Sequence, residues 1–275
     1  MTTCPQLTAT KLRTAPAHVF CSLLSLTSLN LSNNHLQEVS DLGISASSHN
    51  THCLSTLENL DISYNKLTNL PAQAFGHLTR LTELSLEGNR LSSVDAASLS
   101  GLSSLSLLSL SHNQLSSIPQ ATLVSCAELH TLRLDNNQLT DINGLLTAQN
   151  QLRMLNVSAN KLQWFDFAFI PKSVEWIDLH DNQIEELGNY YQLGDGFSLQ
   201  TMDASHNKIR KLSSSSFLSS LEMISLNNNQ IEEISANTFM QMDSLSRVQL
   251  QHNRLVTLQL QALAVRQREQ EGKQL

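Results

Sequence analysis

The chain has 275 residues, with 17 lysines and arginines against 24 aspartates and glutamates, which gives a formal net charge of -7. An acidic chain of this kind lacks the basic surface that nucleic acids attract, so nucleic acid is excluded as an expected partner. The sequence has no apolar run of about 18 residues, which excludes a membrane-spanning helix. Its beginning also lacks the apolar centre of a signal peptide.

One template recurs along the chain and is clearest at residues 81–94, L-T-E-L-S-L-E-G-N-R-L-S-S-V. Its reduced form, L-x-x-L-x-L-x-x-N-x-L-x-x-L, is the pattern of a leucine-rich repeat. The alternation of apolar and polar residues predicts a short strand here. Its inward side chains are Leu84 and Leu86, and Glu83, Ser85 and Glu87 point outward.

Residues 1–19 resemble half of a degenerate repeat, with Leu7 and Leu12 at inward positions and Thr10 where the template has asparagine. About ten full repeats follow, which begin 22 to 25 residues apart except for a first interval of 31 residues. Because a repeat array has no internal boundary, residues 1–258 are predicted to form one elongated array. Residues 259–275 form a charged tail outside the repeat.

The template asparagine is present in every full repeat, and we expect it to satisfy backbone groups that the turn after each strand leaves unpaired. Its amide carries both donors and an acceptor, so it can bond the backbone of its own turn and of the next coil. We call this column the asparagine ladder. It consists of Asn34, Asn65, Asn89, Asn113, Asn137, Asn160, Asn182, Asn207, Asn229 and Asn253.

A large apolar residue stands six positions before the first leucine of several repeats: Phe20, Phe75, Leu99, Leu123 and Phe239. These side chains are predicted to fill the convex half of each coil and to hold it wider than the strand side, where spacing is about 4.8 Å. The predicted fold is therefore an α/β repeat solenoid, a curved horseshoe with a parallel β-sheet on its concave face.

The sequence contains no G-x-S-x-G, no phosphate-binding glycine loop, no H-E-x-x-H and no C-x-x-C pair. His112, His206 and His252 each precede a ladder asparagine, on exposed turns of coils that are not adjacent. We therefore expect no enzyme activity, no catalytic residue, no metal and no cofactor.

The cysteines point to an oxidising compartment. Cys21 and Cys53 lie five and four residues before the first leucine of adjacent repeats, so their Cα atoms should be about 5 to 7 Å apart, which suits a disulfide. The bridge would close the one long interval of the array. Two reduced, buried thiols are the alternative. Cys126 stands where other repeats have leucine and is predicted to be a packed free thiol.

Two glycosylation sequons occur, Asn30-Leu-Ser and Asn156-Val-Ser. Both asparagines are outward residues of predicted strands, so glycans there would cover part of the concave face. The alternative is that these triplets arise from the repeat composition alone and are not modified.

Aromatic residues are concentrated between positions 164 and 197. The phenylalanines of this stretch are interpreted as core filling for the shorter coils, whereas Trp176, Tyr190 and Tyr191 are candidates for an exposed interaction surface. Trp176 shares its outward strand position with other large apolar residues. The candidate partner contacts are Leu107, Met154, Trp176, Tyr190, Tyr191 and Met223.

Residues 173–258 contain E-L-G-N-Y-Y and D-A-S-H-N, phrases more specific than the repeat pattern, and the N-terminal part reads F-C-S-L-L-S-L-T-S-L-N-L-S-N-N before D-L-G and a second cysteine. In these features the chain resembles the ectodomain of arthropod long Toll-type receptors, the Tollo-like group. The resemblance spans nearly all of residues 15–258.

The resemblance implies a glycosylated single-pass receptor whose repeat domain lies outside the plasma membrane and binds a secreted cystine-knot protein or another cell-surface leucine-rich-repeat protein. It also implies a receptor dimer and a role in innate immune or developmental signalling. Since the sequence contains no signal peptide, membrane helix or signalling domain, it is interpreted as an ectodomain fragment that cannot signal alone. An intracellular leucine-rich-repeat scaffold or adaptor is the alternative.

Overall fold

A computed structural model describes residues 7–16, 19–44, 54–189, 196–240 and 242–256. The chain divides into two compact units, Met1–Lys161 and Leu162–Leu275. We refer to them as the first and the second unit. The predicted C-terminal tail and most of the long first insertion lie outside the described residues.

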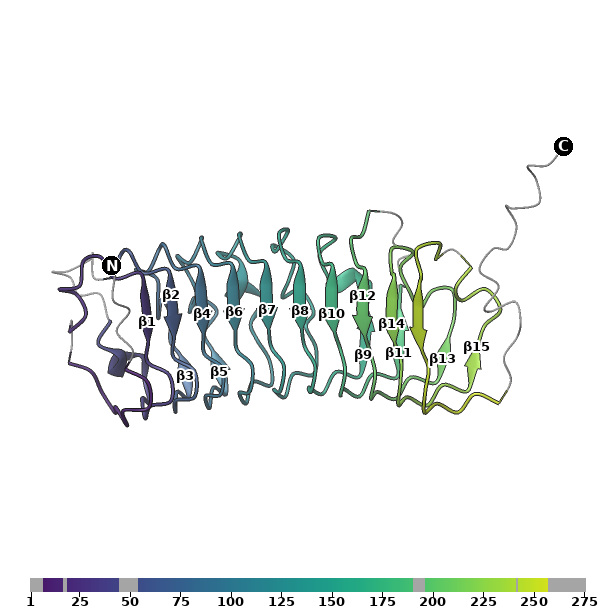
Figure 1. Cartoon of the computed structure of the whole chain (residues 1–275), viewed down its shortest axis with the longest axis horizontal. Helices are drawn as coiled ribbons and strands as arrows, with labels where there is room; N and C mark the ends of the chain where they lie inside the picture. The colour runs from purple at the N-terminus through teal and green to yellow at the C-terminus, as the bar shows by residue number, and fades with distance from the viewer. Residues whose placement is uncertain (1–6, 17–18, 45–53, 190–195, 241, 257–275) are drawn as a thin grey trace. The chain divides into compact units, whose positions relative to one another are not determined.

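Parallel three-residue strands, one per coil, line one side of each unit, side by side and pointing the same way (Figure 1). In the first unit they are β1 (Ser28–Asn30), β2 (Asn59–Asp61), β4 (Glu83–Ser85), β6 (Leu107–Ser109), β7 (Thr131–Arg133) and β8 (Met154–Asn156). In the second unit they are β10 (Trp176–Asp178), β12 (Thr201–Asp203), β14 (Met223–Ser225) and β16 (Arg247–Gln249).

The strands pair in register, so that equivalent leucines of successive coils stack. Leu84 of β4 lies between Leu60 and Leu108, and Leu132 of β7 lies between Leu108 and Leu155. Each of these side chains is at most 2% exposed. The predicted parallel-sheet solenoid is confirmed, and its core is a column of leucines running along each unit.

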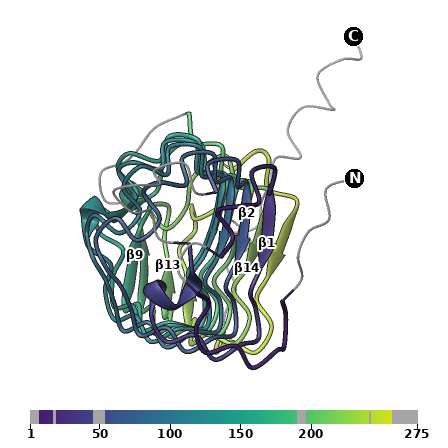
Figure 2. The same ribbon diagram turned by 90° about the vertical axis from the view of Figure 1, so that its left-hand side faces the viewer.

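Short two-stranded sheets form on the other side of the coils: β3 (Asn69–Leu70) with β5 (Ser93–Val94), β9 (Trp164–Asp166) with β11 (Glu186–Gly188), and β13 (Lys211–Leu212) with β15 (Glu233–Ile234). In the second unit, β9 and β13 lie opposite β14 when the coils are viewed end on (Figure 2). Three short 3-10 helices, η1 (Val39–Leu42), η2 (Gln120–Leu123) and η3 (Phe167–Phe169), complete the described elements.

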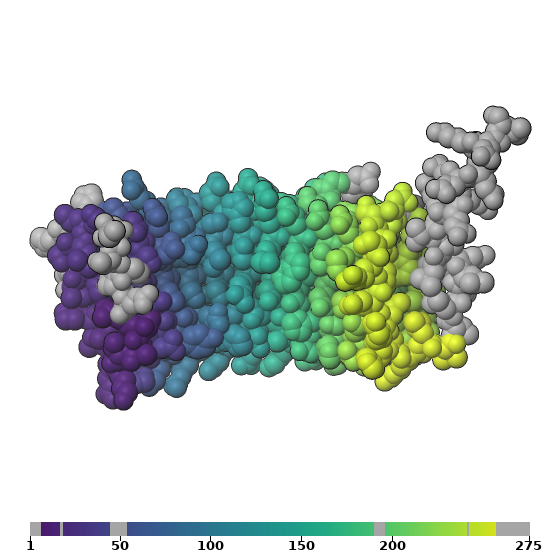
Figure 3. Space-filling model, viewed as in Figure 1, coloured from purple at the N-terminus to yellow at the C-terminus, as the bar shows by residue number. Residues whose placement is uncertain are grey.

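The large residues predicted for the convex half of the coils are buried, with Phe75 and Leu99 inaccessible and Phe239 4% exposed. In the second unit the rings of Phe217 and Phe239 stack with their centroids 5.8 Å apart. Within each unit, successive coils follow one another as bands of atoms in contact (Figure 3). Packing of large side chains therefore continues from coil to coil away from the sheet.

The asparagine ladder forms hydrogen bonds that join each coil to the one before it. Asn137 donates from Nδ2 to Leu134 O at 3.0 Å in its own turn and to Leu110 O at 2.9 Å in the preceding coil. Its Oδ1 accepts from Leu115 N, also in the preceding coil, at 3.0 Å. The prediction that each ladder asparagine bonds the next coil was therefore wrong in direction. The amide bonds the preceding coil, because the turn after the strand points the side chain toward it.

Every ladder asparagine follows a residue in the left-handed conformation, since the chain must reverse its direction sharply after each strand. The column comprises Asn33, Tyr64, Gly88, His112, Asn136, Ala159, Asp181, His206, Asn228 and His252, with φ between 49° and 66°. Glycine, asparagine and aspartate tolerate this conformation at little cost, whereas tyrosine and alanine do not favour it.

The N-terminal half repeat forms backbone hydrogen bonds with the first full coil. Leu7 N donates to Asn30 O at 3.1 Å, and His35 N donates to Leu12 O at 2.7 Å. Thr10 stands in place of the ladder asparagine, and its Oγ1 lies 3.0 Å from Oδ1 of Asn34. The hydroxyl of Thr10 thus bonds the first ladder asparagine, Asn34, from the position where the template has an amide.

The exposed strand face as a candidate binding surface

The outward residues of the strands make a polar face in which large apolar side chains are embedded. Met154 of β8 is 40% exposed and Met223 of β14 is 36% exposed. Leu107 and Trp176 occupy the same strand position and are half-buried. Trp176 is therefore less exposed than predicted, while Tyr190 and Tyr191 lie outside the described residues.

Tyr64 is an exposed aromatic residue that the sequence analysis missed, because it stands at a turn position rather than on a strand. Its side chain is 50% exposed, and its hydroxyl donates to Glu87 Oε1 at 2.6 Å. This hydrogen bond and the charge of Glu87 raise the pKa of Tyr64. Its ring lies against Gly88, where an added Cβ would come within 2.5 Å of Tyr64 Cδ1. Glycine at 88 is thus needed for the ring to lie across the turn.

Asp135 is a buried carboxylate, 5% exposed, at the edge of the strand face in the first unit. Its Oδ1 accepts from Ser111 Oγ at 2.6 Å, and its Oδ2 accepts from Asn136 Nδ2 at 3.0 Å. Arg133 Nε and His112 Nε2 each lie 3.9 Å from one of its oxygens. The exposed side chains of Arg133 and His112 thus lie near this buried carboxylate.

A second group of acidic and histidine side chains lies on the turns after β10 and β12. Nδ1 of His180 lies 2.7 Å from Oδ1 of Asp178, and its Nε2 lies 3.8 Å from Oδ2 of Asp181. Burial acts to lower the pKa of His180, but the hydrogen bond and charge of Asp178, with the charges of Asp181 and Asp203, outweigh it and raise this pKa. His180 of the second unit thus lies in an acidic setting.

Both sequon asparagines lie on the strand face, half-buried, and use their side-chain oxygens to close the following turn. Asn30 Oδ1 accepts from Ser32 N at 2.9 Å, and Asn156 Oδ1 accepts from Ser158 N at 3.0 Å. In addition, Asn30 Nδ2 donates to Asp61 Oδ2 at 3.0 Å. Glycosylation at Asn30 and Asn156 stays a prediction.

The cysteines differ in state. Cys21 is disulfide-bonded, and its predicted partner Cys53 lies outside the described residues, so this pairing stays a prediction. Cys126 is a free thiol with no exposed surface, as expected for a residue in a leucine position. Burial raises the pKa of the Cys126 thiol to about 11. Such a thiol is chemically inert in the folded chain.

The aromatic stretch divides between core and surface. Phe165 and Phe167 are at most 1% exposed and pack edge to face, with ring centroids 5.4 Å apart. Trp164 is 44% exposed and packs edge to face on Phe169 at 5.1 Å. The interpretation of the phenylalanines as core filling holds for the first two, and Trp164 is the exposed aromatic residue of this stretch that the prediction did not choose.

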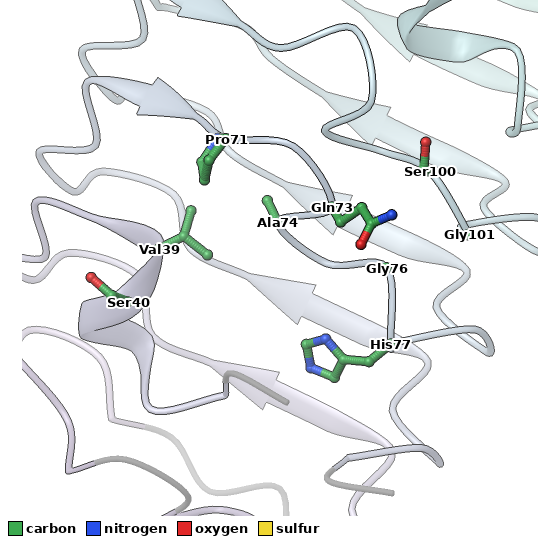
Figure 4. A pocket seen from close by; sticks show the side chains of 9 residues that line it. All are labelled: Val39, Ser40, Pro71, Gln73, Ala74, Gly76, His77, Ser100 and Gly101. Atoms are coloured by element: carbon green, nitrogen blue, oxygen red, sulfur yellow. The ribbon is translucent and has the colours of Figure 1, made fainter. Parts of the chain in front are cut away.

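A pocket of about 580 Å³ lies away from the strand face in the first unit, and Val39 faces Pro71 and Ala74 across it (Figure 4). The buried Nε2 of His77, which also lines it, has no hydrogen-bond partner among the described residues. Burial lowers the pKa of His77, against a hydrogen bond with the backbone of Ile44 that raises it. Besides His77, the described lining includes the hydroxyl side chains of Ser40 and Ser100, and it contains no carboxylate, cysteine or lysine.

Within the described ranges, no group of three or more histidine, cysteine, aspartate or glutamate side chains is arranged to hold a metal ion. The same part of the chain has no helix with the length and apolar character needed to cross a membrane.

Residues 55–115, 103–162 and 197–255 match the family described as leucine rich repeat, and residues 25–47 match a second family of that description. These matches cover more than half of the chain, which therefore belongs to the leucine-rich repeat family. Proteins of this family generally act as protein-binding modules rather than as enzymes.

Among curated proteins, the chain is similar to Toll-like receptor 7 of Drosophila melanogaster, with 37% identity over 125 residues, which are 46% of this chain and 9% of the receptor. Among solved structures, it is similar to the APL1 leucine-rich repeat domain, with 27% identity and a TM-score of 0.74 over 89% of this chain and 60% of that one.

A second solved structure, the LRIM1/APL1C complex, matches with 27% identity and a TM-score of 0.75 over 89% of this chain and 43% of the matched chain. An internalin of Listeria monocytogenes, 22% identical with a TM-score of 0.66 over 86% of this chain and 64% of that one, shares the fold alone. The chain thus spans less than two thirds of the length of each of these four relatives.

Proposed function

We propose that this chain is the protein-binding part of a Toll-type receptor ectodomain, without enzyme activity and without a cofactor, and that it binds its partner on the exposed strand face. The observation that carries the proposal is the presence of Met154 on the strand face of the first unit and of Met223 on that of the second, each more than a third exposed among outward residues that are largely polar. Exposed large apolar side chains within a polar surround are typical of protein interfaces. The similarity to Toll-like receptor 7 supports the receptor class, within which the Tollo-like group is the finer assignment proposed here.

An extracellular location in innate immune or developmental signalling is part of the same proposal. The disulfide at Cys21 supports it, because disulfides persist in oxidising compartments. Peptide mapping of secreted protein without reduction should recover Cys21 joined to Cys53 and glycans on Asn30 and Asn156. Recovery of Cys53 as a free thiol would contradict the pairing, and unmodified asparagines would contradict the glycoprotein assignment.

A second leucine-rich-repeat protein is the partner we favour, since LRIM1 and APL1C form a complex and the match to it covers most of this chain. A secreted cystine-knot protein is the other class of partner that the Toll resemblance implies. A receptor dimer is a special case of the favoured class, in which the second leucine-rich-repeat protein is another copy of the receptor. The relatives support the first class more directly.

The test is binding of the secreted chain to purified arthropod leucine-rich-repeat ectodomains, to cystine-knot proteins and to itself, by biolayer interferometry and light scattering. The variant Met154→Glu places a charge on the strand face and should weaken binding by about tenfold or more. Val124→Glu is the matched control, because Val124 is 57% exposed but follows η2, away from the strands.

The control variant should bind within about twofold of the unchanged chain. Equal weakening by both variants, or by neither, would show that the strand face is not the binding surface. Absence of binding to every member of the panel at concentrations up to about 100 μM, well above those of specific complexes, would contradict the proposed function itself.

A further inference from the structure

The strand face of the second unit carries a short apolar row that crosses its first three strands. In register, Trp176 of β10 lies beside Thr201 of β12, and Thr201 lies beside Met223 of β14. Since neighbouring strands are about 4.8 Å apart, Trp176 and Met223 are separated by about 10 Å. The threonine between them is half-buried and contributes a methyl group and a hydroxyl, so the row combines two large apolar side chains with a smaller, partly polar one.

Carboxylates precede and follow this row in the sequence of its strands. Asp178 and Asp203 follow Trp176 and Thr201 on their strands, two residues on and therefore on the same face of the sheet. Glu175 and Glu222 directly precede the strands that carry Trp176 and Met223. We call these four carboxylates, together with Trp176, Thr201 and Met223, the Trp176–Met223 strip.

Two of the carboxylates have fixed orientations. Asp203 Oδ1 accepts from Ser205 N at 2.8 Å, and Asp178 Oδ1 accepts from His180 N at 3.0 Å. Since Asp203 is already ordered, a partner that binds it loses little additional conformational freedom. Asp178 is 8% exposed and its Oδ1 also lies 2.7 Å from His180 Nδ1, so it adds negative charge beneath the surface rather than a direct contact. Arg247 of β16, beside Met223, supplies a positive charge at the end of the strip.

The first unit offers an internal comparison. On its last two strands the outward side chains include Arg133, and Arg153 directly precedes Met154, so positive charge lies beside the exposed methionine there. In the second unit the equivalent position before Met223 is Glu222. The residue that directly precedes the exposed methionine is thus basic in the first unit and acidic in the second.

We propose that the Trp176–Met223 strip binds an extended, cationic segment of a partner protein, with an apolar side chain of that segment seated between Trp176 and Met223 and its lysine or arginine side chains paired with the flanking carboxylates other than Asp178. This inference rests on the proposed function and specifies the partner chemistry. Charge complementarity selects the occupant: four carboxylates repel nucleic acid and anionic lipid, whereas the apolar row requires more than a simple cation.

The test uses the whole chain and a synthetic peptide of about ten residues that alternates lysine or arginine with leucine, which spans about 33 Å when extended. The chain has two tryptophans, so Trp164→Phe leaves Trp176 as the only one and keeps an aromatic ring against Phe169. The fluorescence of Trp176 then reports binding at the strip. An acidic peptide of the same pattern and the polyamine spermine are the comparison ligands.

Asp203→Asn and Met223→Ala test the two kinds of contact. Asparagine keeps the acceptor that closes the turn, as Asn30 and Asn156 do at the same position in other coils, so Asp203→Asn removes the charge and leaves the local fold intact. The controls are Asp61→Asn and Val124→Ala in the first unit, the second at an exposed apolar residue away from the strands. Circular dichroism of all variants verifies that they are folded.

The cationic peptide is expected to shift the Trp176 emission, with binding that weakens as sodium chloride is raised. Asp203→Asn and Met223→Ala should each weaken it by about fivefold, and the controls by less than about twofold. Equal binding of the acidic peptide, no change in Trp176 emission, or equal loss in the controls would overturn the proposal. Complete displacement of the cationic peptide by spermine would also overturn the proposal, because a ligand without apolar side chains would then bind as well as the peptide and the apolar row would not contribute to binding. If Met154→Glu still weakens a protein partner in that case, the proposed function stands without this occupant.

Discussion

Two coils with the same sequence template differ in how well they bury it. In the coil of β7, inside the first unit, Leu129, Leu132 and Leu134 have no exposed surface. In the coil of β16, the last described coil of the second unit, Leu245 and Leu250 are half-buried. β7 pairs with β6 and β8, whereas the one strand described as pairing with β16 is β14. The inward face of a coil is therefore buried by its neighbours rather than by the coil itself, and the template alone does not fix its stability.

The largest effect should come from removing an inward side chain in each of these coils. Leu132→Ala leaves a cavity between two stacked neighbours and should lower the free energy of unfolding by about 2 to 5 kcal/mol. Val248→Ala, at the equivalent position of β16, removes a half-buried side chain and should lower it by less than about 1.5 kcal/mol. Urea unfolding followed by circular dichroism measures both. Similar losses in the two variants would mean that the last coil is as well covered as the interior.

Ladder asparagines should also differ between an interior coil and the last described coil, with smaller losses of stability than the inward leucines. Asn137→Ala leaves buried carbonyls and an amide of two coils without partners, and we expect a loss of about 1 to 3 kcal/mol. Asn253 makes equivalent bonds to Leu226 O and Ile231 N but is half-buried, so water can replace its amide. Asn253→Ala should therefore cost less than about 1 kcal/mol. If Asn137→Ala unfolds at the wild-type urea midpoint, the ladder does not contribute to stability.

His180 should make the free energy of unfolding depend on pH. The folded pKa of His180 is raised above its ordinary value of 6.5, so the folded chain binds this proton more tightly than the unfolded chain. The stabilisation is complete below the unfolded pKa and is lost as the pH rises through the folded pKa. The ring is 37% exposed and screened by solvent, which limits the effect to about 1 kcal/mol.

His180→Asn should therefore have a lower free energy of unfolding than wild type at pH 5, and the difference should be smaller at pH 8.5. Urea midpoints across this pH range decide the question. A gap between His180→Asn and wild type that widens toward high pH would reverse the sign argued here.

The smallest effect is a chemical one with no change in stability. With a pKa of about 11, about one Cys126 thiol in a thousand is ionised at pH 8, and the side chain has no exposed surface. Iodoacetamide should leave Cys126 unmodified in the native chain and label it readily in guanidinium chloride. Peptide mass spectrometry reads out the result, and rapid native labelling would show that the first unit opens at this coil.

The sequence by itself determined the positions of the strands, the inward leucines and the ladder asparagines, because each is dictated by local periodicity and by backbone groups that every turn leaves unpaired. The same reasoning placed Cys126 in the core, since it occupies a leucine position of the template. These features repeat in every coil, so one coil predicts the next.

Contacts between coils were decided by the tertiary structure alone. Tyr64 is oriented by Glu87 and Gly88, which lie 23 and 24 residues later in the chain, and Asp135 is buried by Ser111 of the coil before it. The direction of the ladder bonds and the half-burial of Trp176 depend on how the coils stack. Such features join residues of different coils that no local sequence pattern relates. The interactions stabilise the chain only when the two coils are in contact.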